Sequence, residues 1–150
     1  SQLNNFQHLS NIFTNNSTVS LAKKLCELSG MSKVFFANSG AEANENALKL
    51  ASFHTGKKKV IAFKHAFHGR TSAAVEVTDN PHITAPINSN NNVYFAEMDI
   101  QEVEKELQNG DVCAVIIEGI SGVGGIQIPD KDFLTALRDL TKKTRQHPHS

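Results

Sequence analysis

The 150-residue chain lacks several features that would place it in a specialised class of protein. Basic and acidic residues number 15 each, so there is neither a global basic field for nucleic acid nor an acidic tail. No apolar run approaches the length of a membrane span, and the polar residues 1–5 are not typical of a signal peptide. A globular protein remains, and we expect it to be cytoplasmic, without a membrane or nucleic-acid partner.

Metal and disulfide chemistry also have little support. The only cysteines, Cys26 and Cys113, lie far apart within apolar patterns, which favours buried free thiols. His65 and His68 could be read as a metal-binding pair, but no third ligand is spaced to join them. We therefore expect no metal site.

Alternating strand and helix patterns predict an α/β fold with a mostly parallel sheet and right-handed crossovers. The predicted strands are 33–37, 60–63, 93–95 and 112–117, and the predicted helices are 20–29, 41–54, 99–110 and 130–140. The continuous apolar run 112–117 is typical of a central strand covered on both faces. We expect residues 1–17 to be an extended lead-in, and the segment 72–92 to be a long loop that is functional or covers a site. No internal repeat or domain boundary is evident.

The stretch 34–45 predicts a strand, a polar turn and the start of a helix. Ser39 suits the N-cap, and Glu42 completes the S-x-x-E pattern of a capping box. Since a helix N-terminus presents free N–H groups, the turn is either a phosphate cradle or an ordinary capped helix. The candidates for the buried side of this helix are Ala43, Ala47, Leu48, Leu50 and Ala51.

Unusual residues follow three of the predicted strands, at 38–41, at 67–71 and at Glu118. In a parallel sheet such strand ends meet at one edge, where ligands bind. Together they offer backbone donors, an aromatic plane, an imidazole, a guanidinium and a carboxylate, a combination that suits an anionic, planar ligand. Taken singly, Phe67 could be a core residue and Arg70 a surface charge, whereas Glu118 needs a partner if it is buried.

A dinucleotide cofactor is less well supported. The turn 122–125 is rich in glycine but is not G-x-G-x-x-G, and no acidic residue stands where that fingerprint needs one. A generic α/β nucleotide-binding domain stays open as an alternative.

Three segments resemble the class III pyridoxal-phosphate-dependent aminotransferases, most closely the acetylornithine aminotransferase branch. They are KVFFANSGAEANENALKLA (33–51), IAFKHAFHGRT (61–71) and AVIIEGISGVGGIQIP (114–129). The resemblance runs from about residue 10 to residue 140. It implies an incomplete three-layer sheet of the fold type I transferases, so that residues 1–150 would be part of one large domain.

The resemblance also implies roles for individual residues. The cofactor pyridoxal 5'-phosphate would be bound by Ser39, Gly40, Ala41, Phe67, His68 and Glu118. The Ser-Gly-Ala turn would hold the phosphate, and Phe67 would stack on the pyridine ring. Arg70 would bind the substrate α-carboxylate. The implied reaction moves an amino group between N-acetylornithine, or a related ω-amino acid, and 2-oxoglutarate, in a homodimer.

Two departures from the family pattern limit these implications. Val123 stands where the family usually has a second glutamate, so the substrate choice stays open. The family's Schiff-base lysine comes later than the matched segments, so we expect no catalytic lysine in these 150 residues, which alone would be inactive. A non-catalytic truncated fragment with at most weak phosphate binding is therefore the second alternative.

Overall fold

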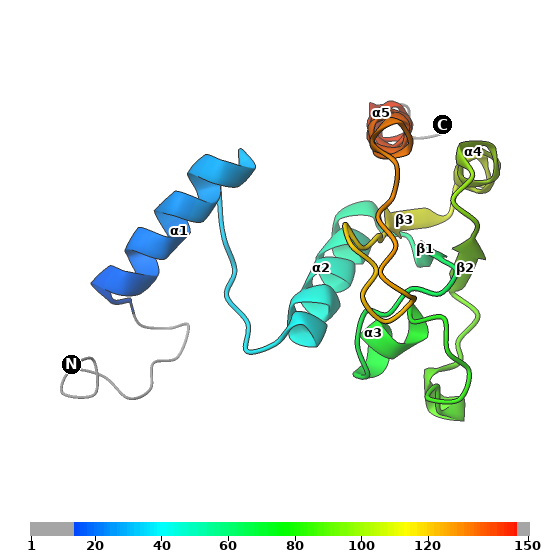
Figure 1. Ribbon diagram of the computed structural model, residues 1–150, viewed down its shortest axis with the longest axis horizontal. Coiled ribbons are helices and arrows are strands. Elements are labelled where there is room, and N and C mark those ends of the chain that lie inside the picture. The colour runs from blue at the N-terminus through cyan, green and yellow to red at the C-terminus, as the bar shows by residue number, and fades with distance from the viewer. Residues whose placement is uncertain (1–13, 147–150) are drawn as a thin grey trace. The chain divides into compact units, whose positions relative to one another are not determined.

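The computed structural model describes residues 14–146, and the chain divides into two compact units, residues 1–38 and 39–150 (Figure 1). The sequence pattern predicted no boundary at this point. The assignment of residues 1–150 to one partial domain stays a prediction. Each unit is described by itself.

The first unit contains helix α1 (Asn16–Ser29). Its N-cap is Asn15, whose side-chain oxygen accepts a hydrogen bond from the Thr18 amide at 2.8 Å. The helix ends at Gly30, which has a φ of 69° in the left-handed region that glycine adopts without strain. The predicted start at Ser20 is wrong, because Asn15 satisfies the free amides of the first turn several residues earlier.

Two other predictions for this unit need correction. Residues 33–37 form no strand, and Phe35 in their middle is 64% exposed. A run of strand formers becomes a strand only where a neighbouring strand pairs with it. The predicted lead-in over 1–17 ends earlier, since Asn16 and Ser17 are helical, and residues 1–13 lie outside the described part of the chain.

The second unit is built on a parallel sheet in the order β2-β1-β3. Its strands are β1 (Lys59–Phe63), β2 (Val93–Ala96) and β3 (Val112–Val115). The predicted α/β fold with a parallel sheet is confirmed. The prediction that 112–117 is a central strand is wrong for the described residues, because β1 lies in the centre and β3 at an edge. An apolar run indicates burial but does not identify the neighbours of a strand.

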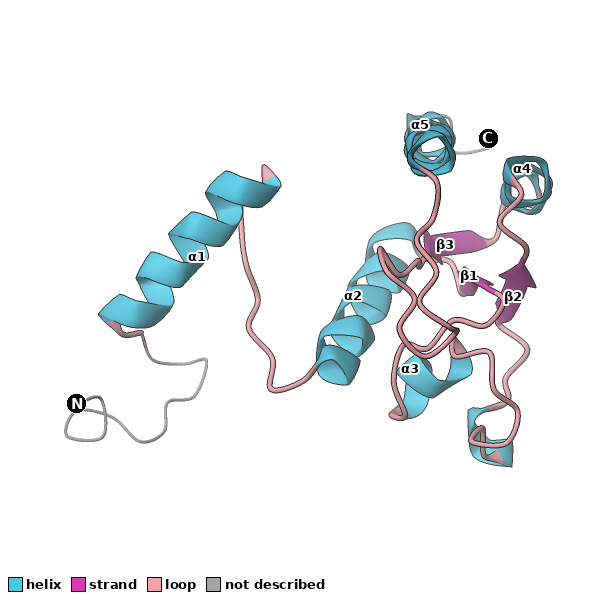
Figure 2. Ribbon diagram, viewed as in Figure 1, coloured by secondary structure: helices cyan, strands magenta, loops and turns pink. Residues whose placement is uncertain are grey.

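Helices cover both faces of the sheet and make three layers (Figure 2). On one face, Ile61 and Phe63 of β1 pack against α4 (Ile100–Gln108) and α5 (Lys131–Gln146). On the other face, the alternate residues Val60 and Ala62 share a cluster with residues of α2 (Gly40–Thr55) and α3 (Ser72–Glu76). The alternation follows from the two-residue period of a strand. The fully buried core residues include Ile61, Phe63, Val75, Val77 and Val103.

The helix predictions hold for α2, α4 and α5 in position but not always in burial. In α2, Leu48 is buried as predicted, whereas Leu50 is 70% exposed and Ala43 and Ala47 are exposed too. The apolar residues of α2 span more of its circumference than the sheet covers. In α4, Asp99 is the N-cap as predicted, since its carboxylate accepts from the Gln101 amide at 2.9 Å.

The segment 72–92 is not a bare loop, because it contains α3 and the short 3-10 helix η2 (Pro86–Asn88). Cys26 and Cys113 are free thiols, but they are half-buried rather than buried as predicted. None of the helices within residues 14–146 is long and apolar enough to cross a membrane.

Candidate functional site

The start of α2 has the features of an anion-binding helix terminus. Ser39 is the N-cap, as predicted, and its hydroxyl oxygen accepts a hydrogen bond from the Glu42 amide at 3.2 Å. A Cβ added to Gly40 would meet nothing within 4 Å, so there is open space beside the first turn. A helix end with free amides and open space can receive an anionic group.

Gly69 brings the loop after β1 against this helix end. A Cβ at Gly69 would lie 2.7 Å from the Cβ of Ala41 and 2.9 Å from that of Ala74, and its φ is 138°. Such close approach is possible only for a residue without a side chain. Two of the predicted segments, 38–41 and 67–71, are therefore in contact through Ala41 and Gly69.

Glu118 ties the end of the apolar run after β3 to the same loop. Its Oε2 accepts a hydrogen bond from the Phe67 amide at 3.0 Å. The half-buried carboxylate therefore has a hydrogen-bond partner, which we expected for a buried glutamate at this position. Farther along the turn, a Cβ at Gly124 would lie 2.6 Å from the carbonyl oxygen of His65. Residues 39–41, 67–71 and Glu118 therefore lie together, although the first of these groups follows no strand.

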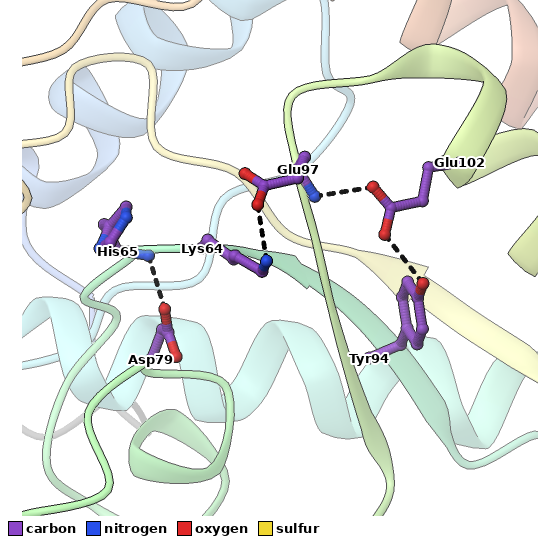
Figure 3. Close-up of polar contacts among 6 residues, drawn as sticks. All are labelled: Lys64, His65, Asp79, Tyr94, Glu97 and Glu102. Carbon is purple, nitrogen blue, oxygen red and sulfur yellow. Dashed lines mark hydrogen bonds and ion pairs between the residues drawn. The ribbon is translucent and has the colours of Figure 1, made fainter.

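Polar contacts fix the chain where it leaves β1 and β2 (Figure 3). Lys64 Nζ lies 2.6 Å from Oε1 of Glu97 in an exposed ion pair that raises the lysine pKa. Glu102 of α4 accepts hydrogen bonds from the Glu97 amide at 3.0 Å and from the Tyr94 hydroxyl at 2.8 Å, which raises the tyrosine pKa. The loop toward Phe67 thus begins from a defined position.

The chain then turns at His65, which has a left-handed φ of 62° although it is not a glycine. The His65 amide donates to Oδ2 of Asp79 at 2.8 Å, and the Asp79 amide donates to the carbonyl oxygen of Ala66 at 2.9 Å (Figure 3 shows the first of these). This reciprocal pair holds the turn that directs residues 67–71 toward α2.

His68 is the most buried polar side chain of the loop, with 6% of its surface exposed. Burial lowers the pKa of its imidazole, and the Glu118 carboxylate offsets this by raising it to a smaller extent. Nε2 has no hydrogen-bond partner among the described residues. The imidazole therefore stays neutral near pH 7, with one polar atom unsatisfied.

Phe67 and Arg70 differ in their surroundings. The Phe67 side chain is half-buried, so it is not a fully buried core residue, which was the alternative interpretation of its sequence position. Arg70 is exposed, and within residues 14–146 its guanidinium forms no ion pair or hydrogen bond. Both side chains are thus free to meet a ligand. Their roles toward a cofactor and a substrate stay predictions.

Sequence reasoning missed two residues of α2 that hold this loop. Asn44 Nδ2 donates to the carbonyl oxygen of His68 at 2.8 Å. Glu45 Oε1 accepts from the Thr71 hydroxyl at 2.7 Å and from the Ala74 amide at 2.9 Å. Polar residues on a helix usually indicate a solvated face, so their pattern alone gave no reason to single them out.

Two cavities of the second unit lie beside α2. They measure about 450 and 290 Å³ and lie along the C-terminal half of α2, and Lys49, Ser52 and Lys58 line both. Among residues 14–146, no three histidine, cysteine or acidic side chains are grouped to hold a metal ion. The candidate site is therefore defined by backbone donors and converging loops.

A family model for class-III aminotransferases matches residues 1–146, and the chain belongs to that family. It is 39% identical over 143 residues to the acetylornithine aminotransferase of Archaeoglobus fulgidus, covering 95% of this chain and 38% of that protein. It is 43% identical over 149 residues to the acetylornithine/succinyldiaminopimelate aminotransferase of Buchnera aphidicola, covering 91% and 35%. The chain therefore spans less than two fifths of the length of these relatives.

Solved structures show the same fold. The ornithine aminotransferase of Toxoplasma gondii superposes with a TM-score of 0.84 at 24% identity, covering 96% of this chain and 37% of that one. An ω-aminotransferase of Paracoccus denitrificans gives a TM-score of 0.85 at 22% identity, covering 96% and 39%. The predicted transaminase fold is confirmed, with three parallel strands of its sheet in the described residues.

Proposed function

We propose that this chain forms the phosphate- and ring-binding part of a pyridoxal-phosphate-dependent transaminase. The reaction would move an amino group between N-acetylornithine, or a related ω-amino acid, and 2-oxoglutarate. Membership of the class-III family supports the reaction type. The main observation in support of this site is the contact of Gly69 with Ala41, which places the Phe67 loop beside the N-terminus of α2.

The residues present fit pyridoxal phosphate. The amides at the start of α2 suit a phosphate dianion, and the open space at Gly40 leaves room for it. Phe67 offers an aromatic face, and the unpartnered Nε2 of His68 leaves a buried polar atom beside the same loop. When bound, the cofactor supplies the electron sink that amino-group transfer requires.

The chain's own residues would bind and orient. Ser39 caps α2 and keeps its first-turn amides in line for the phosphate. Glu118 fixes the backbone of Phe67 and with it the position of the ring. Arg70 is free to bind a carboxylate in two parallel hydrogen bonds, the geometry that favours arginine over lysine.

Other parts of the proposal rest on the family resemblance alone. The lysine that holds the cofactor covalently in the family matches no position in these residues, so we expect the isolated 150-residue chain to be inactive. Val123 leaves the acyl group of the substrate open. A cytoplasmic location and a homodimeric state are proposed on the same ground.

The test is equilibrium binding of pyridoxal 5'-phosphate, followed by absorbance, to the wild type and to Gly40→Val. The new side chain has room in the protein but would occupy the space proposed for the phosphate. We expect affinity to fall by a factor of about ten or more, as for loss of a charge-assisted hydrogen bond, with little change in melting temperature.

Gly122→Val is the matched control, because a Cβ there also meets nothing within 4 Å. Its affinity should stay close to that of the wild type. Inorganic phosphate should compete for the site, and ATP should not compete better than phosphate. Equal affinity of the Gly40 variant and the wild type, or preferential binding of ATP, would contradict the proposal.

A further inference from the structure

The backbone of the Phe67 loop is held by side chains from three different segments. The Phe67 amide donates to Glu118, the His68 amide donates to Thr78, and the His68 carbonyl oxygen accepts from Asn44. None of these bonds belongs to a helix or strand ladder. The conformation of the loop therefore depends on the side chains that bind it.

Of the three side chains that hold the loop, that of Thr78 is the most buried. It follows α3, and only 3% of its surface is exposed. Its hydroxyl oxygen accepts the hydrogen bond from the His68 amide at 2.9 Å. The same oxygen lies 2.8 Å from the carbonyl oxygen of Ala74 and 3.1 Å from that of Gly69. Having one hydrogen, the hydroxyl donates to one of them at a time, and the shorter distance favours Ala74.

The Thr78 hydroxyl thus links the last turn of α3 to the loop, because it donates preferentially to Ala74 and accepts from the His68 amide. The bond from the His68 amide is buried, so removing its acceptor would leave an unpaired N–H away from water. Gly69 follows His68 in the chain, and its contact with Ala41 joins the loop to α2. Phe67 immediately precedes His68 in the chain, so the direction of its ring depends on the same bond.

We propose that Thr78 is a positioning residue for the cofactor site, acting through the backbone of His68 on the ring of Phe67. The inference rests on the proposed function, because it assigns the orientation of that ring to cofactor binding. The polar atoms that Thr78 contacts are all backbone atoms of this chain. It therefore acts through the loop and does not touch the ligand.

The experiment compares Thr78→Val, which has nearly the same shape but no hydroxyl, with Thr78→Ser, which keeps it. Each variant of the intact protein is titrated with pyridoxal 5'-phosphate at a temperature where circular dichroism in the far ultraviolet shows it to be folded. The second readout is the circular dichroism induced in the absorption band of the bound cofactor. That signal reports the asymmetric setting of the cofactor, which a merely structural role would leave unchanged in the folded protein.

We expect Thr78→Val to raise the dissociation constant about tenfold, the factor that corresponds to one ordinary hydrogen bond, and to reduce the induced signal. Thr78→Ser should restore both. Thr84→Val is the matched control, since its hydroxyl also donates to a backbone carbonyl oxygen, that of Asn80 at 3.1 Å, but away from the loop. The control should leave both readouts unchanged.

A folded Thr78→Val protein with the affinity and induced signal of the wild type would overturn the inference. If that variant does not fold, Thr78→Cys replaces it, because a thiol is a weak acceptor and should give intermediate values. Wild-type values for a folded Thr78→Cys would overturn the inference as well. Failure of the wild type itself to bind the cofactor would instead overturn the proposed function.

Discussion

The buried imidazole of His68 makes the stability of the folded protein depend on pH. Its folded-state pKa lies below the ordinary value of about 6.5, because burial penalises the charged form. Between these two values the unfolded chain binds a proton that the folded chain does not. The contribution of this group is therefore fully present above about pH 6.5 and is lost as the pH falls through the folded-state pKa.

We expect the free energy of unfolding to fall more steeply as the pH decreases below about 6.5 in the wild type than in His68→Gln, since glutamine does not titrate. Urea denaturation at several pH values gives the two slopes. His82 is exposed, so His82→Gln should keep the wild-type slope and is the control. Equal slopes for the wild type and His68→Gln would show that His68 does not contribute.

Gly69 is a residue whose replacement should cost considerable stability. The added methyl group of Gly69→Ala would lie 2.7 Å from the Cβ of Ala41, in a backbone conformation that other residues rarely adopt. We expect a loss of about 2–4 kcal/mol from overpacking and backbone strain together. The denaturation midpoint checks this loss.

The control for that measurement is Gly119→Ala. A Cβ at Gly119 would meet nothing within 4 Å, and its φ is not in the left-handed region. Its stability should stay within about 0.5 kcal/mol of the wild type. A Gly69 variant as stable as this control would mean that the loop can move away from α2 at little cost.

At the scale of the element, the start of α2 serves both the helix and the proposed ligand, and two substitutions separate these roles. Ser39→Ala removes the cap and should cost about 1 kcal/mol. Ser39→Asp keeps a capping oxygen and adds a charge that suits a helix N-terminus, so stability should be retained. The same charge should repel a phosphate group.

Thermal unfolding and cofactor titration of both Ser39 variants distinguish the two effects. We expect Ser39→Asp to melt at or above the wild-type temperature and to bind pyridoxal 5'-phosphate about tenfold or more weakly. The matching change at another cap, Asn15→Asp before α1, should leave cofactor affinity unchanged. Unchanged affinity in Ser39→Asp would place the phosphate elsewhere.

At the scale of the whole molecule, local sequence patterns predicted the helices and strands themselves better than they predicted which elements lie beside one another. The runs at β1 and β2 and the periodicities of α2, α4 and α5 predicted elements that the structure contains. The wrong predictions concern the pairing of strands. The strand formers at 33–37 have no strand beside them, and β3 has a neighbour on one side only in the described residues. Pairing is decided by long-range contacts, which a local pattern does not contain.

In the candidate site, too, the features set by local sequence were predicted and those set by long-range contacts were not. Ser39 was predicted as a cap because the S-x-x-E pattern is local, and the topology of a parallel sheet predicted that the strand ends would meet. The contacts of Asn44, Glu45 and Thr78 with the loop were not predicted, because each joins residues distant in the chain. The partner of Glu118 was predicted to exist, but not to be the Phe67 amide.

Exposed apolar residues on α2 affect how the isolated chain behaves in solution. Leu50 and Phe53 are 70% and 81% exposed, and their spacing of three residues makes them neighbours on the helix surface. We expect the 150-residue chain to associate as its concentration rises. The double variant Leu50→Lys/Phe53→Lys should lower the average mass measured by sedimentation without loss of helix signal.

The matched control is Gln101→Lys/Gln108→Lys, which adds the same charge at exposed polar positions of α4. It should associate more than the α2 variant. A wild-type chain that stays monomeric at all concentrations tested would contradict the expectation.

The contact of Gly69 with Ala41 also limits how this chain can diverge. Position 69 already has the smallest side chain, so any enlargement at position 41 has no compensating change available across the contact. Selection from a library that randomises both positions together should therefore recover glycine at 69 and only alanine or glycine at 41.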